Sequence, residues 1–289
     1  PRVDLRGGAR VQEGRLIDCG RVRLHTVIEG TGPTVLLLHG FPEFWYCWRH
    51  QIPALANAGF RAVAPDLTGY NLSDKPKGAE AYRVRYLMDD LLGLIRALGC
   101  ERVHVVAHDW GGVLGWYLAG NHPEVVDRHV SINGPHPTLM LRALQSSWAQ
   151  MRKSWYIFYW QLPWLPEQTV LHPLFMRRAL RGTSTRKEAY TEEVLARYRE
   201  AMARPGAATG AINWYRAIRY PRLRLRRVER PTLVLWGEKD RFLGLETLDG
   251  LDREVSDLRV RRFPEGSHWV LHELPDQVNS AILGFLRES

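Results

Sequence analysis

The stretch VVAHDWGG, residues Val105 to Gly112, decides the fold of this chain. A β-branched run, Val103 to Val106, leads into it, and an apolar run at helical spacing follows, so we expect a strand, a sharp turn and a helix. Asp109 stands at the tip of that turn, and a strained turn of this kind needs small residues two positions away on each side. Ala107 and Gly111 meet this need. The sequence therefore predicts a carboxylate nucleophile, which forms an alkyl ester of the protein as its intermediate.

Strands and helices alternate through most of the chain. This rhythm predicts parallel βαβ units and an α/β, doubly wound, mostly parallel sheet whose ligand site lies beyond the carboxyl ends of the strands. The segments that carry this prediction are the strands Arg21–Glu29 (antiparallel), Thr34–Leu38, Arg61–Ala64, Val125–Ile132, Pro231–Trp236 and Leu258–Phe263, and the helices Ile52–Ala58, Val84–Leu98 and Pro275–Leu286.

A change of pattern predicts an insertion in this sheet. From Asn133 to about Val228, tryptophan and tyrosine are concentrated, helical spacing dominates and no strand is readable. We therefore expect a core in two parts, 1–132 and 229–289, with a helical lid at 133–228 between them.

Composition limits the classes of partner. The net charge of +9 comes almost entirely from arginine, and the dense cluster Arg222–Arg230 is interpreted as a solvated connector in preference to a binding surface. We therefore expect no nucleic-acid partner. No apolar run approaches the roughly 18 residues that span a membrane, so no membrane partner is expected. We expect a monomer or a homodimer. Whether a leader preceded Pro1 stays open.

The cysteines and histidines show no framework or metal pattern. The three cysteines are widely separated, so neither a disulfide framework nor a zinc site is indicated, and a reducing, cytoplasmic setting is expected. The histidines lack spacings such as HExxH, and we expect no metal and no cofactor. His39 and His108 flank the expected site and are interpreted as side chains that orient the backbone through hydrogen bonds.

Two further residues complete a catalytic triad by their order in the chain. A carboxylate nucleophile needs a base to break its ester, and a histidine held by a second acid supplies one. WGEKD places Asp240 after a late strand, and PEGSHW places His268 after the last one. HGFPE follows a buried strand, so the N–H groups of Phe41 and Trp110 are expected to stabilise an oxyanion at Asp109, and Pro42 is a candidate for a cis bond.

Four motifs together carry a family resemblance that covers nearly the whole chain. The segments HGFPEFWYCWRHQIPALANAGFRAVAPDLTGYNLSDKP, HDWGG, WGEKD and GSHW resemble the epoxide hydrolases of the α/β-hydrolase fold. HDWGG is shared with haloalkane dehalogenases and does not decide the substrate. One departure is Asn71, where the family more often has glycine; asparagine tolerates the left-handed conformation, so no functional consequence is expected.

The resemblance extends to two lid tyrosines that hold the epoxide oxygen in the family. SWYIFYWQLP resembles the first lid motif with Tyr156, and NWYR resembles the second with Tyr215; Tyr159 is the substitute if the register is shifted. An opened epoxide leaves an alkoxide, which a phenol can protonate at neutral pH. The substrate pocket is expected to include Phe41, Trp110 and Ile157.

The resemblance implies an enzyme that converts an epoxide and water to a vicinal diol through a hydroxyalkyl ester of Asp109, with a small-molecule epoxide as partner. Two alternatives stay open: a haloalkane or haloacetate dehalogenase, and a non-catalytic ligand-binding protein that kept the fold.

Overall fold

A single eight-stranded sheet organises the residues that the computed structural model describes, namely 3–4, 10–11, 14–221 and 223–288. The strand order is β10-β9-β8-β7-β5-β6-β4-β3, and every pair from β10 to β6 is parallel, whereas β4 pairs antiparallel with both β6 and β3. A short antiparallel pair, β1 and β2, forms a separate two-stranded sheet. The strands are β1 (Val3–Asp4), β2 (Arg10–Val11), β3 (Arg15–Asp18), β4 (Arg23–Glu29), β5 (Thr34–Leu38), β6 (Arg61–Pro65), β7 (Val103–His108), β8 (Val126–Ile132), β9 (Thr232–Gly237) and β10 (Leu258–Phe263).

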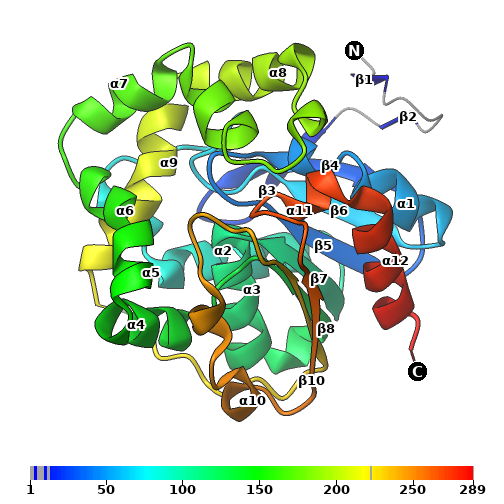
Figure 1. Ribbon diagram of the computed structural model, residues 1–289. Coiled ribbons are helices and arrows are strands. Elements are labelled where there is room, and N and C mark those ends of the chain that lie inside the picture. Colours follow the sequence, from blue (N-terminus) through cyan, green and yellow to red (C-terminus); the bar gives the residue numbers. More distant parts are fainter. Residues whose placement is uncertain (1–2, 5–9, 12–13, 222, 289) are drawn as a thin grey trace.

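Helices cover both faces of the sheet, and Figure 1 shows α2 and α3 on one side with α1, α11 and α12 on the other. The core helices are α1 (Gln51–Asn57), α2 (Val84–Ala97), α3 (Trp110–Asn121), α10 (Leu251–Glu254), α11 (Val270–Glu273) and α12 (Pro275–Leu286). The predicted α/β, mostly parallel sheet is confirmed.

Between β8 and β9 the chain forms helices and no strand in its described part, and these helices lie together on one side of the molecule (Figure 1). They are α4 (Pro137–Ser146), α5 (Trp148–Lys153), α6 (Trp155–Tyr159), α7 (Leu165–Leu171), α8 (Glu192–Ala203) and α9 (Ala207–Arg216). No helix in the described ranges is long and apolar enough to cross a membrane.

The central strands are buried because helices cover both of their faces. All five residues of β5 and all six of β7 are buried, which explains their continuous apolar sequences. β10 lies at the edge of the sheet and exposes most of its residues, in keeping with its sequence LRVRRF. Strand β3 was not predicted from the sequence; it pairs with β4 and extends the antiparallel edge.

The turn between β7 and α3 brings two backbones unusually close. A Cβ atom at Gly111 would lie 2.2 Å from the carbonyl oxygen of Leu38 at the end of β5. Non-bonded contacts of a Cβ atom are essentially never this short, and the oxygen belongs to a buried strand that cannot move aside. Glycine at this position is therefore a requirement of the packing between α3 and the sheet.

We expect Gly111→Ala to destabilise the protein by about 3 kcal/mol, because the new methyl group must displace buried backbone. The measurement is equilibrium unfolding in urea. Gly284→Ala is the matched control: Gly284 lies at an exposed position of α12 with nothing within 4 Å of an added Cβ, so alanine should be neutral or stabilising by up to about 1 kcal/mol. Equal stability of the two variants would contradict this account.

Candidate active site

Asp109 occupies a strained backbone position at the carboxyl end of β7. Its φ of 51° and ψ of −118° are rare for any residue but glycine, and α3 begins at the next residue. The strain is held by buried neighbours on both sides, with Ala107 fully buried in β7. Strain of this kind is concentrated at functional sites. The expected strand, sharp turn and helix are confirmed.

The carboxylate of Asp109 meets two of the expected partners. The backbone N–H of Phe41 donates a hydrogen bond of 2.9 Å to Oδ1, and Nε2 of His268 lies 3.5 Å from Oδ2. Trp110 N–H, the other expected donor, makes no hydrogen bond with this carboxylate within the described ranges, although it is the first amide of α3. The bond between Phe41 and Pro42 is cis.

His268 is held in turn by Asp240, as the order of the motifs predicted. Nδ1 of His268 lies 2.6 Å from Oδ2 of Asp240, and both side chains are buried. The other oxygen of Asp240 accepts hydrogen bonds from the backbone N–H groups of Phe242 and Leu243, and Asn133 Nδ2 donates to Oδ2 at 2.8 Å. The loop after β9 thus holds the Asp240 carboxylate in place, and this carboxylate orients the imidazole ring of His268.

The charges of this arrangement reinforce one another. Burial alone would lower the pKa of His268, but the negative charge of Asp240 and the hydrogen bond with Asp109 outweigh it and raise the pKa to about 10. Burial alone would raise the pKa of Asp109, but His268 and the Phe41 N–H outweigh it and leave the pKa below its ordinary value. The resting site therefore holds an imidazolium between two carboxylates.

Tyr156 and Tyr215 lie together in the cavity that Asp109 lines. Their rings are 6.0 Å apart at an interplanar angle of 85°, and both line the same cavity as Asp109. Burial and the nearby charge of Asp109 raise the pKa of each phenol, so both stay protonated at neutral pH. Tyr159, the substitute in a shifted register, instead hydrogen-bonds through its hydroxyl to Thr169 and does not line this cavity.

The cavity has a volume of about 190 Å³ and extends from Asp109 along two turns of α3. Trp110 and Ile157, both expected in the pocket, line it. Phe41 is not among the lining residues; its ring instead packs on Tyr215 at 5.2 Å. The sequence did not identify the apolar side chains that line the rest of the cavity: Val84, Leu87, Val113, Leu114, Met140, Leu141, Leu144, Ile218 and Leu243.

A buried polar network that the sequence did not reveal contacts the backbone of His268. His108 Nε2 lies 2.9 Å from the backbone oxygen of His268, and His108 Nδ1 lies 3.0 Å from Glu43. Glu43 also contacts His272 at 2.8 Å and accepts a hydrogen bond from Tyr198. Burial would raise the pKa of Glu43, but His272 and His108 hold it well below its ordinary value. The signal available in the sequence was a charged residue, Glu43, in the segment HGFPE five residues beyond the buried strand β5.

The two flanking histidines orient backbone, as expected. His39 Nε2 accepts a hydrogen bond of 2.9 Å from the N–H of Leu67, while His108 anchors the His268 carbonyl. Asn71 has a φ of 40°, so it adopts the left-handed conformation expected for it, and its side chain donates to Asp66. Within the described ranges, no three acidic, cysteine or histidine side chains cluster as a metal site would require.

Comparison with known proteins identifies the family. The sequence model of the α/β hydrolase fold family matches residues 33–275. An AB hydrolase superfamily protein of Bacillus subtilis is 40% identical, over 94% of this chain and 97% of its own. Epoxide hydrolase 4 of Mus musculus is 37% identical, over 95% of this chain and 79% of its own.

A solved structure agrees with these relatives. The crystal structure of Bacillus megaterium epoxide hydrolase in complex with an inhibitor superimposes with a TM-score of 0.87 at 32% identity, covering 95% of this chain and 100% of that one. The chain therefore belongs to the α/β-hydrolase fold family and is a homologue of its epoxide hydrolases, which confirms the resemblance that the motifs indicated.

We expect Asp240→Asn to lower the pKa of His268 from about 10 toward its ordinary value of 6.5, because the charge of Asp240 is the largest contribution that raises it. Nitrogen NMR of labelled histidine would follow the titration. Since a raised pKa in the folded state stabilises the fold fully below about pH 6.5 and loses that effect as the pH rises toward 10, the stability advantage of the wild type should also shrink over this window.

Asp252→Asn is the control for this titration, because it removes the same charge from an exposed position of α10. His268 should titrate there as in the wild type. A His268 that titrates near 6.5 in the unmodified protein would show that the two carboxylates do not act on it as described.

Proposed function

We propose that the protein hydrolyses an epoxide to a vicinal diol through a covalent ester of Asp109. One observation carries this proposal: a carboxylate held at a strained turn shares a cavity with two protonated phenols, Tyr156 and Tyr215. A carboxylate can attack an epoxide carbon, and the phenols can donate to the oxygen that leaves it. The names of the relatives and of the solved structure support the same activity.

In the first half-reaction, Asp109 forms a bond to one epoxide carbon while the carbon–oxygen bond breaks. Oδ1 accepts the Phe41 N–H and is placed to remain the carbonyl oxygen, whereas Oδ2 is placed to attack. The electron pair of the broken bond passes to the epoxide oxygen, which Tyr156 or Tyr215 protonates. General acid help of this kind contributes roughly a hundred- to ten-thousandfold to the rate.

The protonated His268 of the resting site supplies the proton that restores the phenol after this step. When Asp109 becomes a neutral ester, one of the negative charges that raise the pKa of His268 disappears, so the ring gives up its proton more easily. That proton replaces the one that the phenol donated. His268 is then neutral and can act as the base for the second half-reaction.

In the second half-reaction, neutral His268 takes a proton from water, which attacks Cγ of the Asp109 ester. Negative charge develops on Oδ1, where the Phe41 N–H already donates, with Trp110 N–H as the second proposed donor. When the ester breaks, Oδ2 leaves with the diol, and His268 returns its proton to the departing oxygen. The new Asp109 carboxyl then reprotonates His268, which restores the resting site without any cofactor.

The proposed catalytic groups are divided between the two proposed domains. The core segments 1–132 and 229–289 carry the triad and the oxyanion donors, and the lid at 133–228 carries both phenols and Ile157 of the pocket wall. A largely apolar cavity favours an apolar epoxide. The three free cysteines support a reducing, cytoplasmic setting.

Tyr156→Phe and Tyr215→Phe should each slow diol formation by roughly a hundredfold, because each removes a proton donor to the epoxide oxygen. Rapid-quench measurement of the first half-reaction reports this directly. Tyr159→Phe is the matched control in the same helix as Tyr156 and should leave the rate unchanged, since its hydroxyl bonds to Thr169 outside the cavity. A larger effect at Tyr159 than at Tyr156 would overturn the assignment.

His268→Gln should trap the ester, because the substitution removes the base of the second half-reaction but leaves the nucleophile in place. Intact-protein mass spectrometry after addition of styrene oxide should show a mass increase equal to one substrate molecule. Asp109→Asn/His268→Gln should show none. If 1-haloalkanes gave an alkyl ester, with a mass increase equal to the substrate without its halogen and with halide release, while epoxides gave no adduct, the protein would be a dehalogenase instead. If neither class gave one, it would be a binding protein.

A further inference from the structure

The lid exposes an unusually large apolar surface. The side chains of Trp148, Phe158, Trp164 and Trp155 are between 64% and 74% exposed, although large aromatic residues are normally buried for the most part. Leucines extend this surface. We call the set the aromatic lid face; its members are Trp148, Trp155, Phe158, Leu162, Trp164, Leu165, Leu171 and Leu174. Contiguous exposed apolar surface of this kind marks a docking site.

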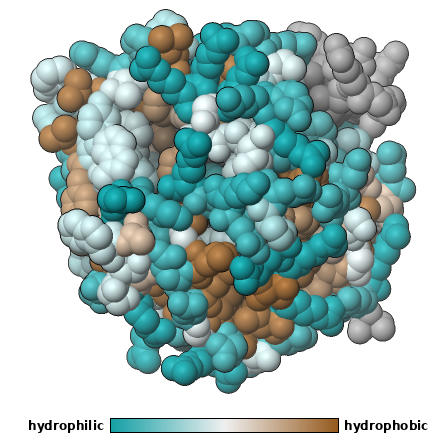
Figure 2. Space-filling model, in the orientation of Figure 1, coloured by the Kyte–Doolittle hydropathy of each residue, from teal (hydrophilic) through white to brown (hydrophobic). Residues whose placement is uncertain are grey.

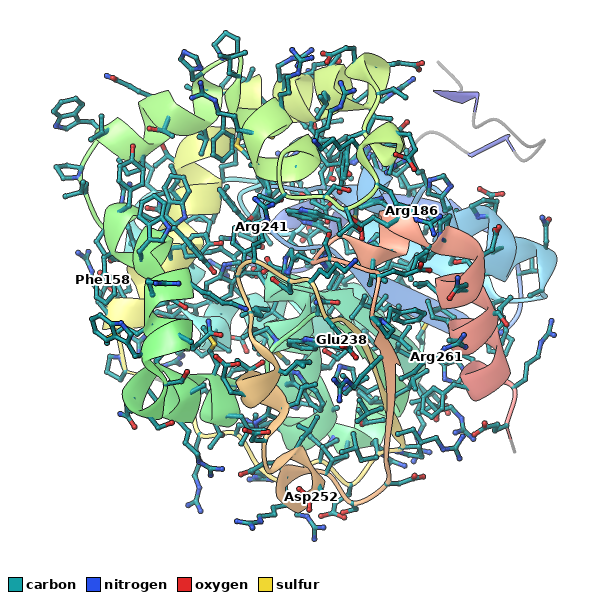
Figure 3. The ribbon with its side chains drawn as sticks, in the orientation of Figure 1. Phe158, Arg186, Glu238, Arg241, Asp252 and Arg261 are labelled. Atoms are coloured by element: carbon teal, nitrogen blue, oxygen red, sulfur yellow. The ribbon has the colours of Figure 1, made fainter. Side chains whose placement is uncertain are left out.

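A chain of two contacts joins the helices α6 and α7 that carry much of the aromatic lid face. Trp155 packs against Tyr159 of the same helix, α6, at 6.2 Å between ring centroids, and the Tyr159 hydroxyl bonds to Thr169 of α7. Figure 2 shows pale and brown surface along the flank over α6 and α7, and Figure 3 shows Phe158 on that flank, across the molecule from Arg261.

Trp164 is presented at this surface by a strained backbone. Its φ is 46°, a conformation that bulky side chains rarely adopt, and Leu165 N–H donates across the turn to the oxygen of Pro163. The indole is nonetheless 65% exposed, so this chain gains little burial from holding it there. Because burial of the indole does not offset the backbone strain at Trp164, this conformation points to a role for the side chain at the surface.

The charge around the aromatic lid face is positive. Residues 148–181 include five lysines and arginines and a single acid, Glu167, which is already paired with Arg216 at 2.5 Å. Arg152 and Arg178 are exposed, and neither has an ion pair within the described ranges. Over 133–228 the sequence carries a net charge of +12, while the rest of the chain carries −3.

We propose that the aromatic lid face docks on the surface of an anionic lipid bilayer. Tryptophan and phenylalanine rings sit at the headgroup level of membranes, and neighbouring arginines are attracted to anionic lipids. A second copy fits less well, because a two-fold contact through this face would place the same positive charges against each other. The absence of a spanning run, which led us to expect no membrane partner, does not bear on binding at the surface.

Docking would place the catalytic cavity next to the bilayer. Helix α6 exposes Trp155 and Phe158 on its outer side, while Tyr156 and Ile157 of the same helix line the cavity. Apolar epoxides partition into lipid, so a docked lid would receive substrate from its surroundings. This consequence rests on the proposed function, whereas the docking itself does not.

Flotation with vesicles tests the docking without reference to activity. The wild type should bind vesicles of phosphatidylcholine with phosphatidylglycerol about tenfold more strongly than vesicles of phosphatidylcholine alone, and high salt should remove the difference. Phe158→Ser/Trp164→Ser and Arg152→Glu/Arg178→Glu should each reduce the binding by about tenfold. Far-UV circular dichroism and the midpoint of thermal unfolding should be those of the wild type in both, which shows that they are folded.

Two matched variants are the controls. Leu16→Ser/Val260→Ser removes two apolar side chains of the sheet domain that are 48% and 44% exposed. Arg253→Glu/Arg261→Glu reverses the charge of two exposed side chains of the same domain. Both should bind vesicles as the wild type does. The proposal is overturned if the wild type does not float with the vesicles, or if the lid variants float as well as the wild type does. A wild type that does not float but forms a dimer, which the lid substitutions abolish, would mean that the aromatic lid face binds a second copy instead.

Discussion

The close approach of the β7–α3 turn to the end of β5 is the constraint on which the rest of this structure depends. Because Gly111 lies against the Leu38 carbonyl, Asp109 is forced into a strained conformation at the edge of the sheet. The same approach brings Phe41, three residues beyond β5, within hydrogen-bond distance of the carboxylate. Backbone packing alone thus brings the proposed nucleophile, Asp109, together with the N–H group proposed to stabilise its oxyanion, before any lid residue is considered.

Electrostatics then sets the state of the site. His268 is buried between Asp109 and Asp240, and a buried charge is tolerated only where partners compensate it. The Glu43 network fixes the His268 carbonyl from behind, so the ring has one orientation. In the proposed cycle, formation of the ester removes one of the two compensating charges, and the same histidine changes from proton donor to base.

The strand pattern, the elbow and the order of the triad could be predicted from the sequence because each depends on local spacing. β10 and α12 have the predicted bounds, and Asp240 and His268 meet where the order of the motifs placed them. Strand β3 could not be predicted because its sequence, RLID, is too short to show an alternation of apolar and polar residues. The cavity wall along α3 and α4 escaped because apolar residues there look the same whether they face a core or a ligand. The Glu43 network joins segments more than 200 residues apart, which no local pattern reveals.

The central claim is that the oxygen added to the product comes first from Asp109. A single turnover in heavy-oxygen water, with enzyme in excess over epoxide, tests it most directly. The account predicts an unlabelled diol and one heavy oxygen in the Asp109 carboxylate, found by mass spectrometry of the peptide that contains it. A labelled diol from the first turnover, with Asp109 unlabelled, would mean that water attacks the epoxide directly and would contradict the covalent mechanism.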